Sequence, residues 1–251
     1  MKRIIAFLLL PLLAFTFIAC NPDEEEESTT KLVKTVKLEV FKNEEVVQIV
    51  SYTYYYDNQN RVIKIETLYW EDTPPYYYES TTNFKYSANT IFVNDSFLYQ
   101  LDANGYLISD VFGITYIYEN GYLKETRNES GDSTKYTWSN GNIVQSFGTY
   151  YSMIGDTIYT YTTNYEYTNK ENLLNIILPW DSGYEFVGVL LKFKGTANKN
   201  LLKKVTNQEG IRLDVTDYQF DEKGYPIQII LNLYSPYPII QEKQKYTITY
   251  Y

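Results

Sequence analysis

One short unit recurs along this chain and constrains its fold more than any other feature. It joins an aromatic strand end, a turn and an apolar strand start, and residues 99–107 show it clearly as YQLDANGYL. Asp in such a turn accepts hydrogen bonds from the turn amides, and Gly or Asn supplies the positive φ that closes a hairpin. Each unit therefore predicts a β-hairpin. The copies occupy residues 54–62, 86–89, 99–107, 116–123, 136–143, 167–173, 193–201 and 218–225.

The residues beside these turns are typical of strands. Tyr-x-Tyr pairs place two rings on one face of a strand, where they pack against rings or β-branched side chains of the next strand. The chain holds 29 Tyr, 12 Phe and 3 Trp, and no segment has the apolar spacing of a helix. Asp57, Asp102 and Asp221 occupy turn positions, so we interpret these carboxylates as structural.

Longer and more varied turns alternate with the repeated units, for example at residues 71–76, 152–156, 179–183 and 235–238. The alternation predicts about 18 strands in an unbroken antiparallel up-and-down meander. An open sheet of that width would curl or split, so we expect one all-β domain over residues 31–251, closed or nearly closed as a barrel. The repeated turns then lie on one rim and the longer turns on the other.

The N-terminal residues have the pattern of an export signal. Lys2 and Arg3 precede an apolar run over residues 4–18, which is too short to span a bilayer comfortably. Ala19 and Cys20 follow and resemble a lipobox, so we predict a signal peptide over residues 1–19 and a lipid on Cys20. Because Cys20 is the only cysteine, an intramolecular disulfide is excluded.

An acidic segment follows the cysteine, and residues 20–30 should form a solvated tether because they cannot bury apolar surface. The segment also resembles the signal that exports Bacteroidetes lipoproteins to the outer face of the outer membrane. Without Lys2 and Arg3 the net charge becomes −9 − 2 = −11, so nucleic acid is not an expected partner and lipid is the expected membrane contact. The acidic residues are Asp23, Glu24, Glu25, Glu26 and Glu27.

Together, the lipobox, the tether and the Tyr-x-Tyr-Asp hairpin units resemble a Bacteroides lipoprotein family of unknown function, the domain-of-unknown-function family 4595. The resemblance covers the mature chain and implies a porin-like fold, but it carries no functional residues. A weaker similarity is to the Tyr-Asp repeats of Rhs-type shells, whose Arg after the turn is matched only by Arg61. The strand predicted over residues 62–68 is polar on both faces, unlike a lipid-facing strand, so we expect a tethered barrel in water.

Several kinds of chemistry are excluded by composition. The chain has no His, which removes Ser-His-Asp catalysis and His-ligated zinc, and the domain has no thiol. We therefore expect neither enzyme activity nor a cofactor or metal, and a carboxylate-dependent hydrolase is the least favoured reading.

Aromatic residues beside the longer turns are the best candidates for binding. Exposed rings stack on sugars or other flat ligands, although in a chain so rich in Tyr they also pack inward. The leading hypothesis is a surface lipoprotein that binds a glycan or a partner protein through this rim; the alternative is a structural or transport accessory whose barrel carries an apolar ligand. Ser133 and Thr157 lie in short sequences that resemble O-glycosylation sites. The candidate rim residues are Trp70, Tyr76, Tyr78, Tyr150, Trp180 and Tyr237.

Overall fold

The computed structural model describes residues 31–251 apart from 73, 111, 152–157, 174–194 and 237–238. Lys31–Tyr251 forms a compact unit of its own. The predictions for residues 1–30, Thr157, Trp180 and Tyr237 lie outside the described residues. The strands are β1 Val33–Lys42, β2 Glu45–Tyr56, β3 Val62–Glu71, β4 Tyr76–Ser87, β5 Thr90–Val93, β6 Phe97–Leu101, β7 Leu107–Ser109, β8 Thr115–Glu119, β9 Tyr122–Arg127, β10 Ser133–Ser139, β11 Asn142–Tyr151, β12 Ile158–Glu171, β13 Asn200–Asn207, β14 Arg212–Phe220, β15 Pro226–Pro236 and β16 Ile239–Tyr250.

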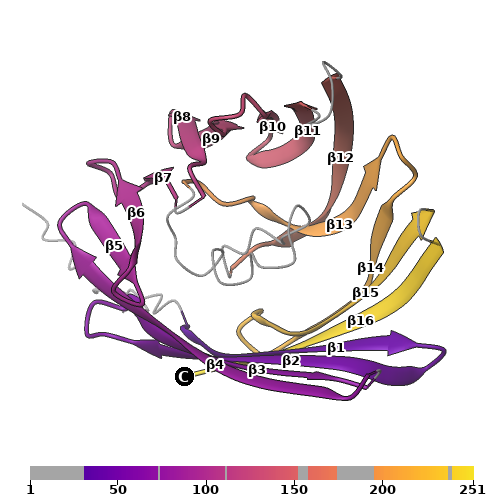
Figure 1. Ribbon diagram of the computed structural model, residues 1–251. Helices are drawn as coiled ribbons and strands as arrows, with labels where there is room; N and C mark the ends of the chain where they lie inside the picture. Colours follow the sequence, from indigo (N-terminus) through magenta and orange to yellow (C-terminus); the bar gives the residue numbers. More distant parts are fainter. Residues whose placement is uncertain (1–30, 73, 111, 152–157, 174–194, 237–238) are drawn as a thin grey trace, which may run out of the picture. The chain divides into compact units, whose positions relative to one another are not determined.

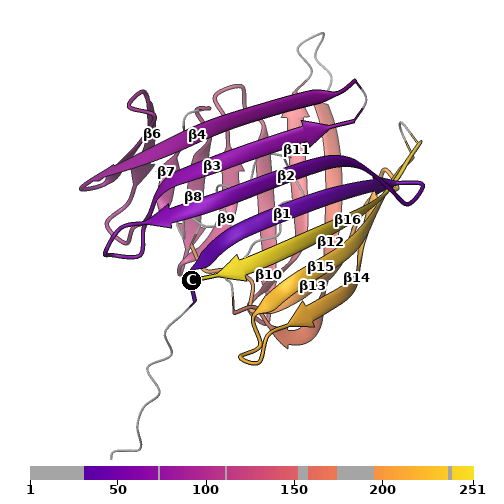
Figure 2. The same ribbon diagram turned by 90° about the horizontal axis from the view of Figure 1, so that it is seen from below.

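The strands form a closed antiparallel barrel. Each pairs with its neighbours in the sequence, and the first strand pairs with the last, so that Leu38 of β1 lies between Tyr246 of β16 and Val50 of β2. Figures 1 and 2 show the colours following the chain around the sheet, and Figure 2 shows β1 beside β16. The predicted all-β, up-and-down barrel is confirmed. Among the described residues, no helix is long and apolar enough to cross a membrane.

The barrel has sixteen strands rather than about eighteen. Two more were expected between the units at 167–173 and 193–201, in a segment that lies largely outside the described residues; β12 pairs directly with β13, as in Tyr165 with Val205. Neither unit contains the turn Asp that marks the clear copies. They also lack the Asn-Gly pair that closes the hairpins at 116–123 and 136–143 without an Asp, so neither place has the local turn signal of the clear copies.

The repeated turns have the expected hydrogen bonds. Asp102 Oδ1 accepts hydrogen bonds from the backbone amides of Asn104 and Tyr106, both at 2.8 Å, and Gly105 supplies a φ of 81°. Asp57 and Asp221 are bonded in the same way. These three carboxylates are therefore structural, as predicted.

The two rims differ less than the sequence suggests. The turns that follow odd-numbered strands form one rim, here called the mouth rim; the chain enters and ends at the other, the terminal rim. Three mouth-rim turns, at 110–114, 128–132 and 207–211, have the same five-residue form, with Asp110, Asn128 or Asn207 as acceptor. For these three turns the expectation of a longer and more varied form is wrong; the expected turns 152–156, 179–183 and 235–238 lie wholly or partly outside the described residues. The connection 172–199, which contains the expected turn 179–183, joins strands that end at the terminal rim.

Side chains alternate between two faces of different chemistry. On one face Val36, Tyr54 and Ile65 are almost fully buried; on the other, Lys37 pairs with Glu39, and Lys64 with Glu66. Since a closed barrel can cover only its inner face with its own chain, the apolar face is the interior. The main core cluster lies near the terminal rim and comprises Val33, Val36, Tyr54, Val62, Ile65, Phe84, Ile91, Ile229 and Ile248.

Aromatic side chains at the ends of even-numbered strands tie neighbouring strands together. The Tyr56 hydroxyl donates to the Val33 carbonyl at 2.7 Å, and the Tyr86 hydroxyl donates to the Val62 carbonyl at the same distance. The Trp138 indole N–H donates to the Leu123 carbonyl at 2.7 Å. The tyrosine of the repeat is thus both a packing residue and a hydrogen-bond donor, and Trp138 packs against Tyr122 of the neighbouring unit.

The two ends of the barrel domain, at Lys31 and Tyr251, are held together at the terminal rim. The Lys31 ammonium pairs with Asp221 and lies 5.5 Å from the ring centroids of both Tyr225 and Tyr250. The Tyr251 amide donates to the Leu32 carbonyl at 3.0 Å. Burial alone would raise the pKa of Asp221, but the hydrogen bonds from Lys31 and the turn amides lower it. The chain therefore leaves the barrel from this rim.

Two hairpin glycines provide a test of the turn geometry. Gly105 and Gly121 both have a φ of 81°, but a Cβ at Gly105 meets nothing within 4 Å, whereas at Gly121 it would lie 3.2 Å from the Thr196 hydroxyl oxygen. We expect Gly105→Val to lower the free energy of unfolding by about 1 kcal/mol through backbone strain. Gly121→Val should cost more, because Thr196 must also move. Denaturant unfolding measures both, and equal losses would contradict this packing.

A tyrosine-walled pocket inside the mouth

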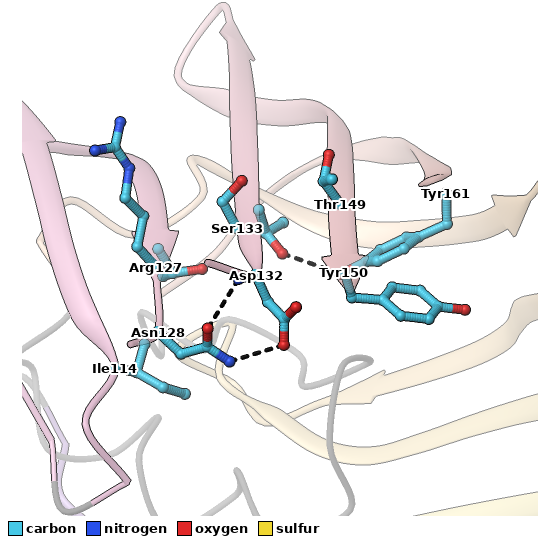
Figure 3. A pocket seen from close by; sticks show the side chains of 10 residues that line it. Ile114, Arg127, Asn128, Asp132, Ser133, Thr149, Tyr150 and Tyr161 are labelled. Carbon is cyan, nitrogen blue, oxygen red and sulfur yellow. Dashed lines mark hydrogen bonds between the residues drawn. The ribbon is translucent and has the colours of Figure 1, made fainter. Parts of the chain in front are cut away.

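A cavity of about 230 Å³ lies just inside the mouth rim on β8 to β12. Figure 3 shows its side chains. The cavity is smaller than the usual site for a drug-sized ligand, so it suits the end of a larger molecule or a small polar one. Its lining residues are Ile114, Thr126, Arg127, Asn128, Asp132, Ser133, Thr134, Thr149, Tyr150 and Tyr161.

A glycine shapes the floor of the pocket. Gly148 of β11 pairs with Tyr161 of β12 and with Thr134 of β10. A Cβ on Gly148 would lie 2.0 Å from the Tyr161 ring, so only glycine lets this ring lie across β11. The Tyr161 and Thr134 hydroxyls consequently meet at 3.0 Å and share a hydrogen bond. Two hydroxyl groups from separate strands are thereby fixed on the floor.

Tyr150, which lines the pocket, belongs to an aromatic stack. The rings of Tyr150 and Tyr159 are stacked, with centroids 5.2 Å apart and planes 17° from parallel. Their side chains remain 39% and 47% exposed, so the stack presents aromatic surface to an incoming ligand. A flat, partly apolar molecule such as a sugar ring fits such a surface.

Fixed polar groups also line the pocket. Asp132 accepts hydrogen bonds from the Tyr151 amide and the Asn128 side-chain amide, both at 2.8 Å. The Tyr151 bond is the main reason that the pKa of Asp132 is lowered. A carboxylate with a lowered pKa accepts hydrogen bonds at neutral pH and is a poor proton donor, which favours binding over acid catalysis.

The guanidinium of Arg127 does not point into the pocket. It makes two hydrogen bonds to Glu125, of 2.8 and 2.9 Å, and Figure 3 shows it turned away from Asp132. These bonds lower the pKa of Glu125. Among the described residues, no group of three or more His, Cys, Asp or Glu side chains is placed to hold a metal ion.

The described aromatic candidates lie at one rim, the mouth rim, but on different walls of the barrel. Tyr150 lines the pocket, but Trp70, Tyr76 and Tyr78 lie on β3 and β4, eight strands away in the barrel. Trp70 pairs with Tyr77 on the outer face, whereas Tyr76 and Tyr78 are on the inner face. Trp180 and Tyr237 lie outside the described residues.

Several residues of the pocket are not among the candidates that the sequence suggests. Thr134, Asn128 and Tyr161 were not among the candidates, although the alternation of Tyr and Thr in β12 places Tyr159 and Tyr161 on one face. Ser133, a candidate O-glycosylation site, begins β10, borders the pocket and is half-buried between β9 and β11. Thr157 lies outside the described residues.

The fold and pocket define an antiparallel porin-like barrel with an aromatic mouth. No protein-family model matches the chain, and no curated protein matches it. Among solved structures, a porin-like protein from Bacteroides uniformis is similar, with a TM-score of 0.62 and 14% identity over 88% of this chain and 99% of that chain. Another, from Bacteroides vulgatus, has a TM-score of 0.41 and 13% identity over 87% and 99%. The first similarity confirms the porin-like fold.

Proposed function

We propose that this protein is a non-catalytic lipoprotein of the bacterial outer surface that binds a glycan at the mouth of its barrel. The observation that carries the proposal is the pocket, which combines the Tyr150 stack, the paired hydroxyls of Thr134 and Tyr161, and the fixed acceptor Asp132. Stacking surface beside several hydrogen-bonding groups matches the alternating apolar faces and hydroxyl edges of a sugar ring.

The anchoring part of the proposal rests on Cys20, the acidic tether and the place where the chain joins the barrel. The described chain enters the barrel at Lys31, which pairs with Asp221 at the terminal rim, whereas the pocket lies at the mouth rim. Charged pairs such as Lys64–Glu66 and Arg212–Asp214 lie on the outer wall. They support a barrel surrounded by water, because lipid-facing strands need an apolar stripe.

Two alternatives fit less well. A carrier of apolar cargo needs empty apolar space, yet the apolar inner residues near the terminal rim pack against one another. A carboxylate-dependent hydrolase needs a proton donor, and the pKa of Asp132 is lowered. Membership of the domain-of-unknown-function family 4595 is part of this proposal, and the structural similarity to a porin-like protein from Bacteroides uniformis supports it. A relationship to Rhs-type repeats is the weaker suggestion.

Substitution of Tyr150 tests the binding site. A glycan array should identify neutral ligands of the mature protein, and Tyr150→Ala should weaken their binding by about 1–3 kcal/mol, the usual effect of losing a stacking ring. The melting temperature should change little, because Tyr150 is 39% exposed. Phe147→Ala is the matched control, since Phe147 is 43% exposed on the outer face of the same strand. Equal binding by both variants would place the ligand elsewhere.

Substitution of Cys20 tests the anchor. We expect Cys20→Ala to abolish acyl labelling and to release the protein from the membrane fraction or leave it uncleaved, because no other thiol can accept the lipid. Replacing residues 23–27 with Ala should retain the lipid but withdraw the protein from surface proteolysis of intact cells. Normal labelling of Cys20→Ala would refute the anchor.

A further inference from the structure

A second group of tyrosines lies at the mouth, on β3 and β4. Tyr69 and Tyr76 pack edge to face with centroids 6.0 Å apart, and the Tyr69 hydroxyl donates to Glu71 at 2.7 Å. Tyr76 and Tyr78 are 54% and 47% exposed. These four residues, here called the β3–β4 tyrosine cluster, repeat the chemistry of the pocket: exposed rings, a hydroxyl group and a carboxylate.

The strand register places this cluster on the same face as the pocket. Tyr78 pairs with Tyr69, and following the paired residues from strand to strand leads around the barrel to Tyr165, which shares a face of β12 with Tyr159 and Tyr161. Every residue on this path belongs to the inner face, which the buried core defines. The path runs through Tyr78, Tyr69, Val50, Leu38, Tyr246, Ile229 and Leu231, then Leu233, Leu213, Val205 and Tyr165.

The two groups face each other across the mouth. Both lie beside turns of the mouth rim, and β3 and β4 are eight strands from β11 and β12 in a closed barrel of sixteen. Half of the circumference therefore separates them in either direction. Figures 1 and 2 both show β3 and β4 on the wall opposite β11 and β12.

We propose that the β3–β4 tyrosine cluster is a second subsite for the same glycan, so that one extended neutral chain is held at both walls of the mouth. This inference rests on the proposed function. Both walls carry a carboxylate, Glu71 or Asp132, and the mature chain has a charge of −9 − 2 = −11, so uronic acids and sulfated sugars are repelled. Two contacts on one chain strengthen binding because the second contact forms within the complex.

Chain length and matched tyrosine variants test the second subsite. Linear neutral glucans, mannans and xylans, from disaccharides to polymers, would be titrated into the mature protein by calorimetry. We expect affinity to rise at least about tenfold once a chain spans both walls. Replacing Tyr76 and Tyr78 together with Ala should remove this gain and leave disaccharide binding at the pocket intact. Tyr77→Ala is the control, because Tyr77 is 58% exposed on the outer face of the same strand.

Each outcome decides between the two proposals. A length-dependent gain that survives the loss of Tyr76 and Tyr78, or that Tyr77→Ala removes equally, overturns the second subsite and leaves the pocket standing. If short and long chains bind equally well to the wild-type protein, the second subsite is likewise overturned and the pocket stands. Tighter binding of polygalacturonate than of neutral chains refutes the neutral ligand. No binding of any neutral glycan by the wild-type protein overturns the proposed function and the subsite together.

Discussion

Raising the pH above 10 is expected to unfold the barrel in a cooperative step, because burial raises the pKa of many inner tyrosines. The pKa of Tyr86 rises to about 12, and that of Tyr54 rises well above its ordinary value. In each of these residues, desolvation is the largest cause. The tyrosines with a pKa raised mainly by burial are Tyr52, Tyr54, Tyr56, Tyr86, Tyr99, Tyr118, Tyr167, Tyr218, Tyr246 and Tyr250.

The sign of the effect follows from linkage. A pKa raised by folding means that the unfolded chain releases the proton first, so stability is complete below pH 10 and is lost as the pH rises through the folded pKa values. Each fully buried tyrosine then removes up to about 1.4 kcal/mol per pH unit. Against a total stability of about 5–15 kcal/mol, several such residues suffice to unfold the barrel by about pH 11–12.

Tyrosinate absorbance and circular dichroism, followed together, check this expectation. Most of the absorbance should appear in the same step in which the strand signal is lost; a gradual rise with intact strands would contradict it.

Tyr54→Phe is the informative variant, since the Tyr54 hydroxyl is buried without a hydrogen-bond partner among the described residues. Removing an unsatisfied hydroxyl should raise stability by about 1 kcal/mol and move unfolding to higher pH. Tyr218→Phe should instead lower the free energy of unfolding at neutral pH, because the variant loses the hydrogen bond to the Leu202 carbonyl.

Deleting Tyr250 and Tyr251 is the second change expected to have a large effect. Tyr250 donates to the Pro226 carbonyl and packs against Tyr225, while the Tyr251 hydroxyl donates to the Tyr54 carbonyl at 2.7 Å. Loss of a packed aromatic ring commonly costs about 3–5 kcal/mol, and each hydrogen bond about 1 kcal/mol more. We expect the deletion to lower the free energy of unfolding by at least about 4 kcal/mol, measured in denaturant.

Replacing both residues with Phe separates the two contributions. The rings remain, so only the hydroxyl bonds are lost, and the expected cost falls to about 2 kcal/mol. If the deletion variant unfolds at the same denaturant concentration as the wild-type protein, the aromatic clasp around Lys31 does not stabilise the barrel.

The fold can be predicted from the sequence because each hairpin is specified by residues that are close together in the chain. Asp102 and Gly105 act within one turn, so the hairpin can be read from nine residues. The strand count was too high where this local signal is missing. Residues 167–173 and 193–201 contain neither a turn Asp nor an Asn-Gly pair, and the direct pairing of β12 with β13 depends on contacts between distant residues.

The candidate site was harder to predict because it depends on register. Tyr76 pairs with Glu71 and Trp70 pairs with Tyr77, so Trp70 and Tyr76 lie on opposite faces, which cannot be read from the sequence without this register. Position along the barrel also matters: Tyr76 and Tyr150 share a rim but lie on opposite walls. Gly148 carries no side chain and gives no signal of its own, although it is what admits the Tyr161 ring.

The pairing of β1 with β16 has a consequence for how the molecule is made. Thr35 and Thr249, whose hydroxyls meet at 2.7 Å across this seam, are 214 residues apart in the chain. Such a contact has the highest loop-closure entropy in the protein, and contacts of this kind form late and slowly. Until these two strands meet, the chain therefore carries an open sheet with two unpaired edges, which can pair with other chains. Only arrival of the last residues removes both edges at once, so protection from aggregation is acquired in one final event rather than hairpin by hairpin.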